Sequence, residues 1–163
     1  ALGLFTSDVK WSVRPEYSYF EYGNKNVCAN TINVFLEVEY KPTIFLAREL
    51  MGRNCSSQTV LLHEKEHFNI DKRGLNISIM GAKSSVNKYF SGAKKFNNKN
   101  EMLMYYNNAS NLINSEIGLM LKNNTDGFQR ALDSDAEYAR ISYSFNGEFK
   151  RVMDSVVSNK YFR

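Results

Sequence analysis

Two histidines, the only ones in this chain of 163 residues, lie four positions apart with a glutamate next to the first, in the pentad His63-Glu64-Lys65-Glu66-His67. Residues four apart share one face of an α-helix, so both imidazoles can reach a single metal ion. The pattern H-E-x-x-H is typical of zinc metalloproteases, in which the glutamate activates a water on the metal. We therefore expect His63 and His67 to be zinc ligands and Glu64 to be a general base.

The alternative for such residues is a solvated, charge-paired helix face or a pair of hydrogen-bonded histidines. However, the pentad is preceded by Val60-Leu61-Leu62 and followed by Phe68, so this helix is apolar enough to be buried. Histidines in a buried zone need a compensating partner, and a metal ion supplies one. The neighbouring residues therefore favour the metal site.

A catalytic zinc also needs a third protein ligand, and no further histidine is present to supply it. Asp71 lies one helical turn beyond His67, but a ligand that continues along one straight helix is poorly placed for a tetrahedral site. We expect Asp71 to be a supporting or an exposed residue instead.

The acidic segment 133–138 is a better source of the missing ligand. In it, Asp133 and Glu137 are one helical turn apart, and Tyr138 follows directly. The sequence predicts Asp133 as the third ligand, with Glu137 and Tyr138 as alternatives. These acids could equally be solvated on a helix and pair with nearby arginines, such as Arg140.

Strands are expected in the N-terminal third, before the histidine helix. Residues 5–13 alternate, with Trp11 on the apolar parity, whereas residues 15–30 lack sustained periodicity and predict a loop. Residues 31–40 are the clearest strand, and residues 43–47 resume the pattern after Lys41-Pro42. The residues expected on the apolar face of the clear strand are Ile32, Val34, Leu36, Val38 and Tyr40.

Helices are expected to follow the strands. Helical periodicity runs from about residue 58 to residue 90, with Ser56 or Ser57 as the N-cap, and returns over residues 101–121. The second stripe includes Met104 and Leu112, and Asn123 to Gly127 should end it. Further helices are predicted over 128–143 and 149–161, with a turn at Asn146-Gly147 between them. Strands first and helices afterwards indicate an α+β fold.

Composition limits the functional classes. Hydrophobic residues make up 43% of the chain and charged residues 23%, which is ordinary for a globular protein. The net charge of +4 is mild and its lysines are spread out, so nucleic-acid binding is not expected. There is no apolar run of membrane-spanning length.

Two features suggest export to the periplasm or the exterior. The chain starts at Ala1-Leu2-Gly3, which is compatible with cleavage after a signal peptide. Its two cysteines, Cys28 and Cys55, lack the C-x-x-C spacing of a structural zinc site, so a disulfide between them is favoured. In a reducing compartment they would instead be two thiols.

The histidine helix resembles that of an uncharacterised bacterial family of proposed zinc-dependent proteases. The resemblance is carried by Val60 to Ile70, which reads V-L-L-H-E-x-x-H-F-x-I, after an N-terminal Asp8-Val9-Lys10-Trp11 and a strand pair. In that family a segment like Y-D-x-E-T-x-H-G follows after a long helical interval. Leu132 to Ala139 occupies the comparable place here. Asp133 and Asp135 match the acids of that segment, whereas Ala136, Tyr138 and Ala139 replace its Thr, His and Gly.

The resemblance implies a single zincin-like metallopeptidase domain over residues 1–163, with a small antiparallel or mixed sheet followed by a helical half. It implies peptide hydrolysis with Zn²⁺ as cofactor: a zinc-bound water attacks the carbonyl and Glu64 passes its proton to the leaving amine. A peptide or protein substrate could add to a strand edge in residues 31–40 or 43–47. Candidates for stabilising the oxyanion are Tyr138, Arg140 and Tyr143.

Two alternatives to the enzyme remain. One is a catalytically degenerate zincin-like module that keeps His63 and His67 for metal binding or protein interaction. The other is an interaction protein that binds a partner through its aromatic-rich segment 15–23.

Overall fold

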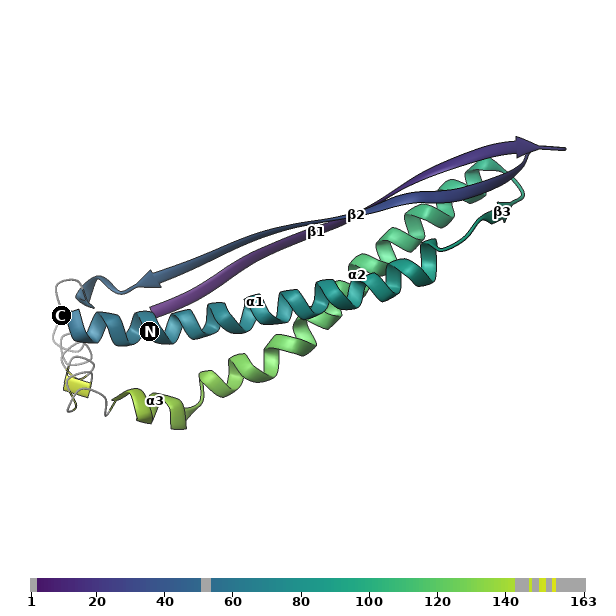
Figure 1. Ribbon diagram of the computed structural model, residues 1–163. Helices are drawn as coiled ribbons and strands as arrows, with labels where there is room; N and C mark the ends of the chain where they lie inside the picture. The colour runs from purple at the N-terminus through teal and green to yellow at the C-terminus, as the bar shows by residue number, and fades with distance from the viewer. Residues whose placement is uncertain (1–2, 51–53, 143–146, 148–149, 152–153, 155–163) are drawn as a thin grey trace. The chain divides into compact units, whose positions relative to one another are not determined.

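A computed structural model describes residues 3–50, 54–142, 147, 150–151 and 154. Two long strands come first in the chain, long helices follow, and a short third strand lies between the first two helices, which confirms the expected α+β class (Figure 1). The elements are β1 (Gly3–Tyr22), β2 (Asn26–Leu46), the 3₁₀ turn η1 (Arg48–Leu50), α1 (Asn54–Phe90), β3 (Lys94–Phe96), α2 (Lys99–Leu132) and α3 (Asp135–Ser142).

The strands form one antiparallel sheet in the order β1-β2-β3, with Cys28 of β2 opposite Lys95 of β3. A tight turn joins β1 to β2, in which Gly23 and Lys25 adopt positive φ angles of 56° and 75°. Both strands are far longer than predicted, because residues 15–22 and 26–30, expected as a loop, belong to them. Alternation was too weak there to indicate strands.

The proline of β2 does not interrupt the strand, contrary to expectation. Strand β2 continues through Lys41-Pro42 to Leu46. Strand β3 pairs only with residues 27–29 of β2, so beyond this point β2 has β1 as its one neighbour in the described sheet. A missing N–H is tolerated on an unpaired strand edge.

The chain forms two compact units. Unit 1 comprises residues 1–7, 41–73 and 125–163, and unit 2 comprises residues 8–40 and 74–124. The elements β1, β2, α1 and α2 each contribute a segment to both units. The four predicted site residues all belong to unit 1, and they are His63, Glu64, His67 and Asp133. The zincin-like domain over 1–163 stays a prediction.

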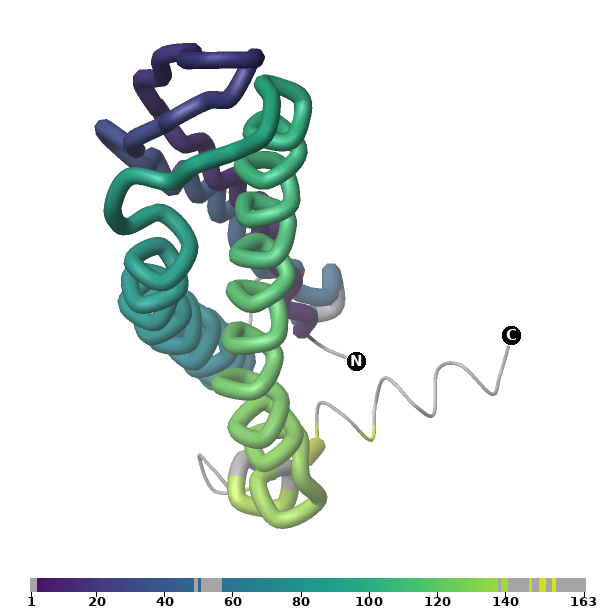
Figure 2. The backbone as a smooth tube through the Cα atoms, turned by 90° about the vertical axis from the view of Figure 1, so that its right-hand side faces the viewer, coloured from purple at the N-terminus to yellow at the C-terminus, as the bar shows by residue number. Residues whose placement is uncertain are grey.

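Unit 2 holds the main apolar core. Its segments of α1 and α2 pack against its part of the sheet (Figures 1 and 2). Trp11 packs against this core, as its place on the apolar parity predicted, and its indole Nε1 donates to the Asn114 carbonyl at 3.0 Å. A Cβ at Gly118 would lie 3.2 Å from the Trp11 ring, so a small residue is needed there. The fully buried members include Val27, Met102, Tyr106, Ile113 and Ile117.

The predicted apolar face of β2 is only partly correct. Thr31 faces inward, where its hydroxyl lies 3.3 Å from that of Tyr106, whereas Ile32 is 61% exposed and Val34 is again half-buried. The inward parity thus shifts from odd to even between Thr31 and Val34, as a β-bulge would produce. On α2, Leu112 was likewise expected in the buried stripe but is 50% exposed.

Helix boundaries also differ from the prediction. Helix α1 spans the predicted range but begins at Asn54, before the expected caps Ser56 and Ser57. Helix α2 does not end at residues 123–127 but continues to Leu132, and Thr125 is buried within it. Gly127 does not stop the helix, because one glycine in a helix costs only about 1 kcal/mol. The expected turn at 146–147 and helix at 149–161 fall largely outside the described residues.

Candidate metal centre

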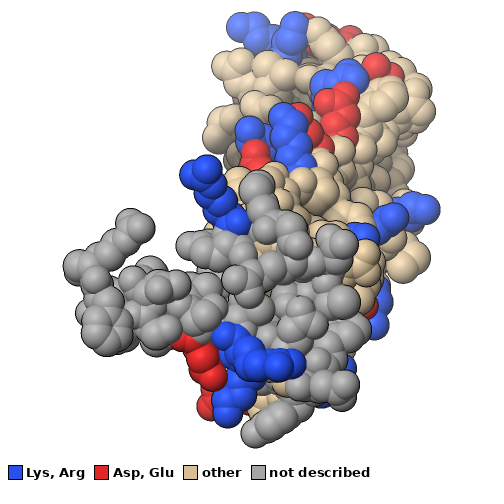
Figure 3. Space-filling model, turned by 90° about the vertical axis from the view of Figure 1, so that its left-hand side faces the viewer, with Lys and Arg blue, Asp and Glu red and all other residues tan. Residues whose placement is uncertain are grey.

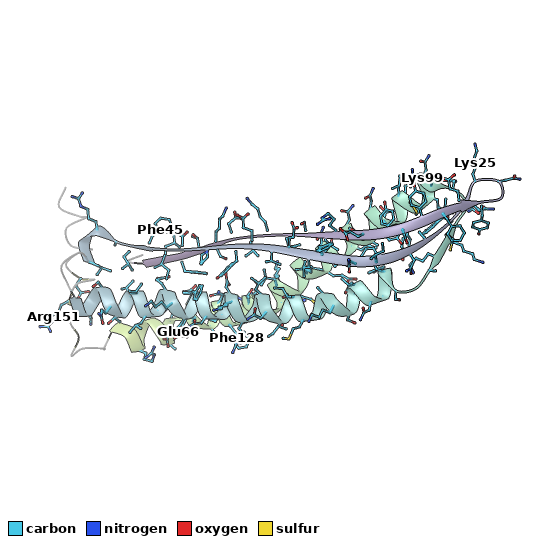
Figure 4. All side chains as sticks on the ribbon, turned by 45° about the horizontal axis from the view of Figure 1, so that its top comes forward. Lys25, Phe45, Glu66, Lys99, Phe128 and Arg151 are labelled. Carbon is cyan, nitrogen blue, oxygen red and sulfur yellow. The ribbon has the colours of Figure 1, made fainter. Side chains whose placement is uncertain are left out.

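The histidine face of α1 is buried in unit 1. Residues 63, 64 and 67 are only 9%, 5% and 7% exposed, whereas Lys65 and Glu66 between them are exposed. Figure 4 labels Glu66 on α1. The helical period thus separates the two glutamates of the pentad, since Glu64 lies on the buried side with the histidines and Glu66 on the outer side.

Three potential ligand atoms converge beside this face. His63 Nε2 and His67 Nε2 are 3.2 Å apart, and Asp133 Oδ1 lies 3.6 Å from the first and 3.1 Å from the second. Asp133 comes from the turn after α2, with its side chain 52% exposed. The structure therefore brings together the three side chains that the sequence singled out as ligands, although ligation itself stays a prediction.

The spacing of these atoms suits a metal ion. Ligand atoms on a tetrahedral zinc, with bonds of about 2.0–2.2 Å, lie about 3.3–3.6 Å from one another. The three distances fall close to this range. Two imidazole nitrogens and a carboxylate oxygen also form a donor set common to zinc and to other divalent ions such as Fe²⁺. The geometry thus supports a divalent metal without selecting zinc.

Glu64 is held by the beginning of β1. The backbone N–H of Phe5 donates to its carboxylate, and a Cβ at Gly3 would come within 2.4 Å of Glu64 Oε1, so only glycine fits there without displacement. Burial raises the pKa of the Glu64 carboxyl above its ordinary value, a shift that His63, His67 and the Phe5 N–H oppose. The raised pKa makes the Glu64 carboxylate a stronger base than an exposed glutamate.

The opposite ring nitrogen of His67 is also engaged. His67 Nδ1 contacts Gln129 Oε1, and Gln129 Nε2 donates to the His67 carbonyl at 3.2 Å and to Asp71 Oδ1 at 2.7 Å. Ser7 Oγ donates to Asp71 Oδ2 at 2.6 Å. Asp71 is therefore hydrogen-bonded to the partner of His67, as one of the two expectations for it requires, and a supporting role at a metal stays a prediction. The sequence prediction missed Gln129, although its position four residues before Asp133 was a usable signal.

A cleft of about 340 Å³ opens next to these groups, entirely within unit 1. Its lining includes Glu64, His67 and Asp133 together with residues 3–5 of β1. The strand segment at the site thus comes from β1, whereas the sequence had pointed to segments of β2. Since β1 is the outer strand in the order β1-β2-β3, it offers a free edge within the described sheet.

The other candidates from the acidic segment lie elsewhere or are not described. Glu137 pairs with Arg140 at 2.5 Å, which lowers the pKa of the Glu137 carboxyl. Arg140 is exposed and pairs with Glu137, and its predicted role at the oxyanion stays a prediction. The side chains of Tyr138 and Tyr143 lie outside the described residues. The helix predicted over 128–143 is interrupted, since α2 ends at Leu132 and α3 begins at Asp135. Ser134 Oγ, between them, accepts a hydrogen bond from the Glu137 N–H at 3.4 Å and caps α3.

The predictions of export and of a disulfide remain untested. Cys28 is half-buried in β2, but the side chain of Cys55 lies outside the described residues. In the described part of the chain, none of the helices has the length and apolarity to cross a bilayer. On the face drawn in Figure 3, basic side chains are interspersed with acidic ones, in keeping with the mild net charge.

The aromatic segment 15–23 forms the distal part of β1 in unit 2. Tyr17 stacks on the core residue Tyr106 with ring centroids 4.2 Å apart, whereas Phe20 is 62% exposed and Tyr22 is also exposed. Lys25 and Lys99 lie at this end of the hairpin (Figure 4). Part of the segment is therefore structural, and a partner for the exposed part stays a prediction.

Comparison with protein-family models, with curated proteins and with solved structures finds no match to this chain.

Proposed function

We propose that this protein is a zinc-dependent peptidase in which His63, His67 and Asp133 hold the metal and Glu64 is the general base. The observation that carries the proposal is the convergence of three ligand atoms, 3.1–3.6 Å apart, next to a buried glutamate. The donor set alone suits several divalent ions, and the H-E-x-x-H spacing on α1 favours zinc among them. The resemblance to the bacterial protease family remains part of this proposal.

The roles of the protein groups follow from their positions. When bound, zinc would polarise the scissile carbonyl and lower the pKa of a water molecule towards neutrality. Glu64 lies one residue after the ligand His63, and its burial raises its pKa, so its carboxylate accepts the proton of the attacking water and later donates it to the leaving amine. The Phe5 N–H keeps the carboxylate oriented towards the cleft it lines.

A peptide fits this cleft better than a compact substrate. Residues 3–5 line the cleft from a strand whose outer edge has no strand partner in the described sheet. An extended peptide can add its backbone hydrogen bonds to such an edge, which would lay a carbonyl across the site. This supports a peptide or protein as substrate.

Peptide cleavage by a zinc-loaded protein, measured on a mixed peptide library, tests the proposal. We expect Glu64→Gln to lower the rate by about 10²–10⁴-fold, because the amide cannot accept the proton. Glu66→Gln makes the same chemical change on the exposed side of α1 and should cleave like the wild type. Equal cleavage by wild type and Glu64→Gln would defeat the Glu64 mechanism, and a protein that stays metal-free in micromolar zinc would defeat the metal site.

A metal-binding module without catalysis is the second candidate. It is favoured by the near-complete burial of Glu64 and by the close approach of Gly3, which restrict access to the base. In that case zinc would bind and stabilise unit 1, chelation would lower its unfolding temperature, and no member of the peptide library would be cleaved.

A further inference from the structure

A chain of hydrogen bonds holds His67 from the side facing away from the converging ligand atoms. It runs from Ser7 on β1 to Asp71 on α1, then to Gln129 on α2, and ends at His67 Nδ1. Asp71 is one helical turn after His67, so the two side chains share the face of α1 that meets Gln129. The Phe5 ring lies nearly parallel to the His67 ring, at 4° with centroids 6.2 Å apart, and borders one of its faces.

The orientation of the Gln129 amide follows from its partners. Its nitrogen lies 3.2 Å from the His67 carbonyl oxygen and 2.7 Å from Asp71 Oδ1. A peptide carbonyl oxygen and a carboxylate oxygen both accept hydrogen bonds. A flipped amide would bring its oxygen against two other oxygens. The amide oxygen must therefore face His67 Nδ1. The oxygen and nitrogen of an amide look alike, and here the hydrogen-bond partners distinguish them.

Two acceptors compete for the hydrogen of the neutral His67 ring. Asp133 Oδ1, 3.1 Å from Nε2, favours a hydrogen there in the absence of metal, whereas the amide oxygen of Gln129, which can only accept, favours the tautomer with the hydrogen on Nδ1. The lone pair of the ring is then on Nε2, the atom that lies 3.2 Å from His63 Nε2 and 3.1 Å from Asp133 Oδ1. Metal-binding histidines commonly depend on such a partner at the second nitrogen for their tautomer and ring orientation.

We propose that Gln129, fixed by Asp71, is a positioning residue that holds His67 in the Nδ1–H tautomer and presents its Nε2 lone pair to the metal. The metal half of this proposal rests on the proposed function. Its tautomer half concerns the metal-free protein and rests on the hydrogen bonds of Gln129, which act against the Asp133 contact at Nε2. Ser7 contributes by donating to the second oxygen of Asp71, which ties β1 to the same network.

The variant that tests the proposal is Gln129→Met, which keeps an unbranched side chain of similar length and removes both polar atoms. Gln58 is the only other glutamine and lies exposed on α1 in the same unit, so Gln58→Met is the matched control. With only two histidines in the chain, long-range ¹H–¹⁵N spectra of the imidazoles are simple to interpret, and His63→Asn assigns their signals.

In metal-free protein with neutral histidines, we expect wild type and Gln58→Met to show more of the Nδ1–H tautomer of His67 than Gln129→Met, in which the Asp133 contact at Nε2 is the remaining one of the two. Gln129→Met should move the signals towards the Nε2–H tautomer. In zinc titrations against a chelator, Gln129→Met should bind about 10–100-fold more weakly, the range for loss of such supporting partners.

A double variant separates positioning from general damage to the fold. Gln129→Glu alone places a carboxylate oxygen against Asp71 Oδ1 and should weaken zinc binding. Combining it with Asp71→Asn exchanges the amide and the carboxylate between the two positions. The new amide at position 71 can then donate to the new carboxylate at position 129, which still accepts from His67 Nδ1. Affinity should therefore recover except for the part due to the hydrogen bond to the His67 carbonyl, which a carboxylate cannot donate. A merely structural effect would not recover in this way.

Unchanged imidazole signals and unchanged zinc affinity in Gln129→Met would overturn the proposal. A tautomer shift with unaltered zinc affinity would overturn the claim that Gln129 strengthens metal binding. If the wild type binds no zinc, the proposed function fails, while the spectra of the metal-free proteins still decide whether Gln129 sets the tautomer of His67.

Discussion

Replacement of Asp133 by alanine is the sharpest test of the candidate metal centre. Asp133 supplies the only carboxylate oxygen of the described group, at 3.1 Å from His67 Nε2 and 3.6 Å from His63 Nε2. Its side chain is half exposed and follows α2 rather than lying inside it. Its removal should therefore weaken metal binding strongly while changing the stability of the metal-free protein little.

The magnitude can be worked from the number of ligands. Structural zinc sites with four protein ligands bind with about 10–16 kcal/mol, or about 2.5–4 kcal/mol for each ligand. Since each 1.4 kcal/mol is a factor of ten, loss of Asp133 should weaken zinc binding by about 10²–10³-fold. At a zinc concentration 100 times the wild-type Kd, the wild type gains about 2.7 kcal/mol of stability, and Asp133→Ala should lose most of this gain.

Competition with a chromophoric chelator measures the affinity, and urea unfolding with and without zinc measures the linked stability. Asp135→Ala is the control, because Asp135 is an exposed acid two residues further on and lies outside the converging group. Wild-type zinc affinity in Asp133→Ala, or an equal loss in Asp135→Ala, would refute the assignment of Asp133 as the third ligand.

Two further predictions concern stability. In the metal-free protein, the raised pKa of Glu64 means that the folded state binds the proton of this carboxyl more tightly than the unfolded state does. Protonation of Glu64 therefore stabilises the folded state fully at pH values below the ordinary pKa of 4.5, and this stabilisation is lost as the pH rises through the pKa of the folded state. Urea unfolding over this range should show that loss in wild type and Glu66→Gln but not in Glu64→Gln; parallel curves for all three would contradict it. In unit 2, Ile113→Ala should cost about 2–5 kcal/mol, because Ile113 is fully buried. Leu112→Ala, at a half-exposed neighbour, should cost clearly less, and equal losses would show that the burial pattern of α2 is wrong.

Much of the local structure could be predicted from periodicity. The repeat near 3.6 residues correctly identified α1, and the alternation around Trp11 correctly placed that ring towards the core. Prediction failed where the pattern was weak or tertiary contacts outweighed it. Residues 15–22 joined β1 despite irregular spacing, because Tyr17 stacks on Tyr106 of α2. In β2 the inward-facing residues change from odd to even numbers near Ile32, and no local sequence pattern predicts this change.

The sequence by itself determined that His63 and His67 share one face of a helix and that Glu64 borders it, because Glu64 is three residues and His63 four residues before His67 wherever the helix lies. Tertiary structure alone decided what completes that face. Asp133 lies far beyond His67 in the chain, and it reaches the histidines because α2 ends at Leu132 and the chain turns there. The same folding brings Gln129 and Ser7 onto the network around Asp71. Such contacts depend on where separate elements pack, and the local periodicity of the sequence does not contain that information.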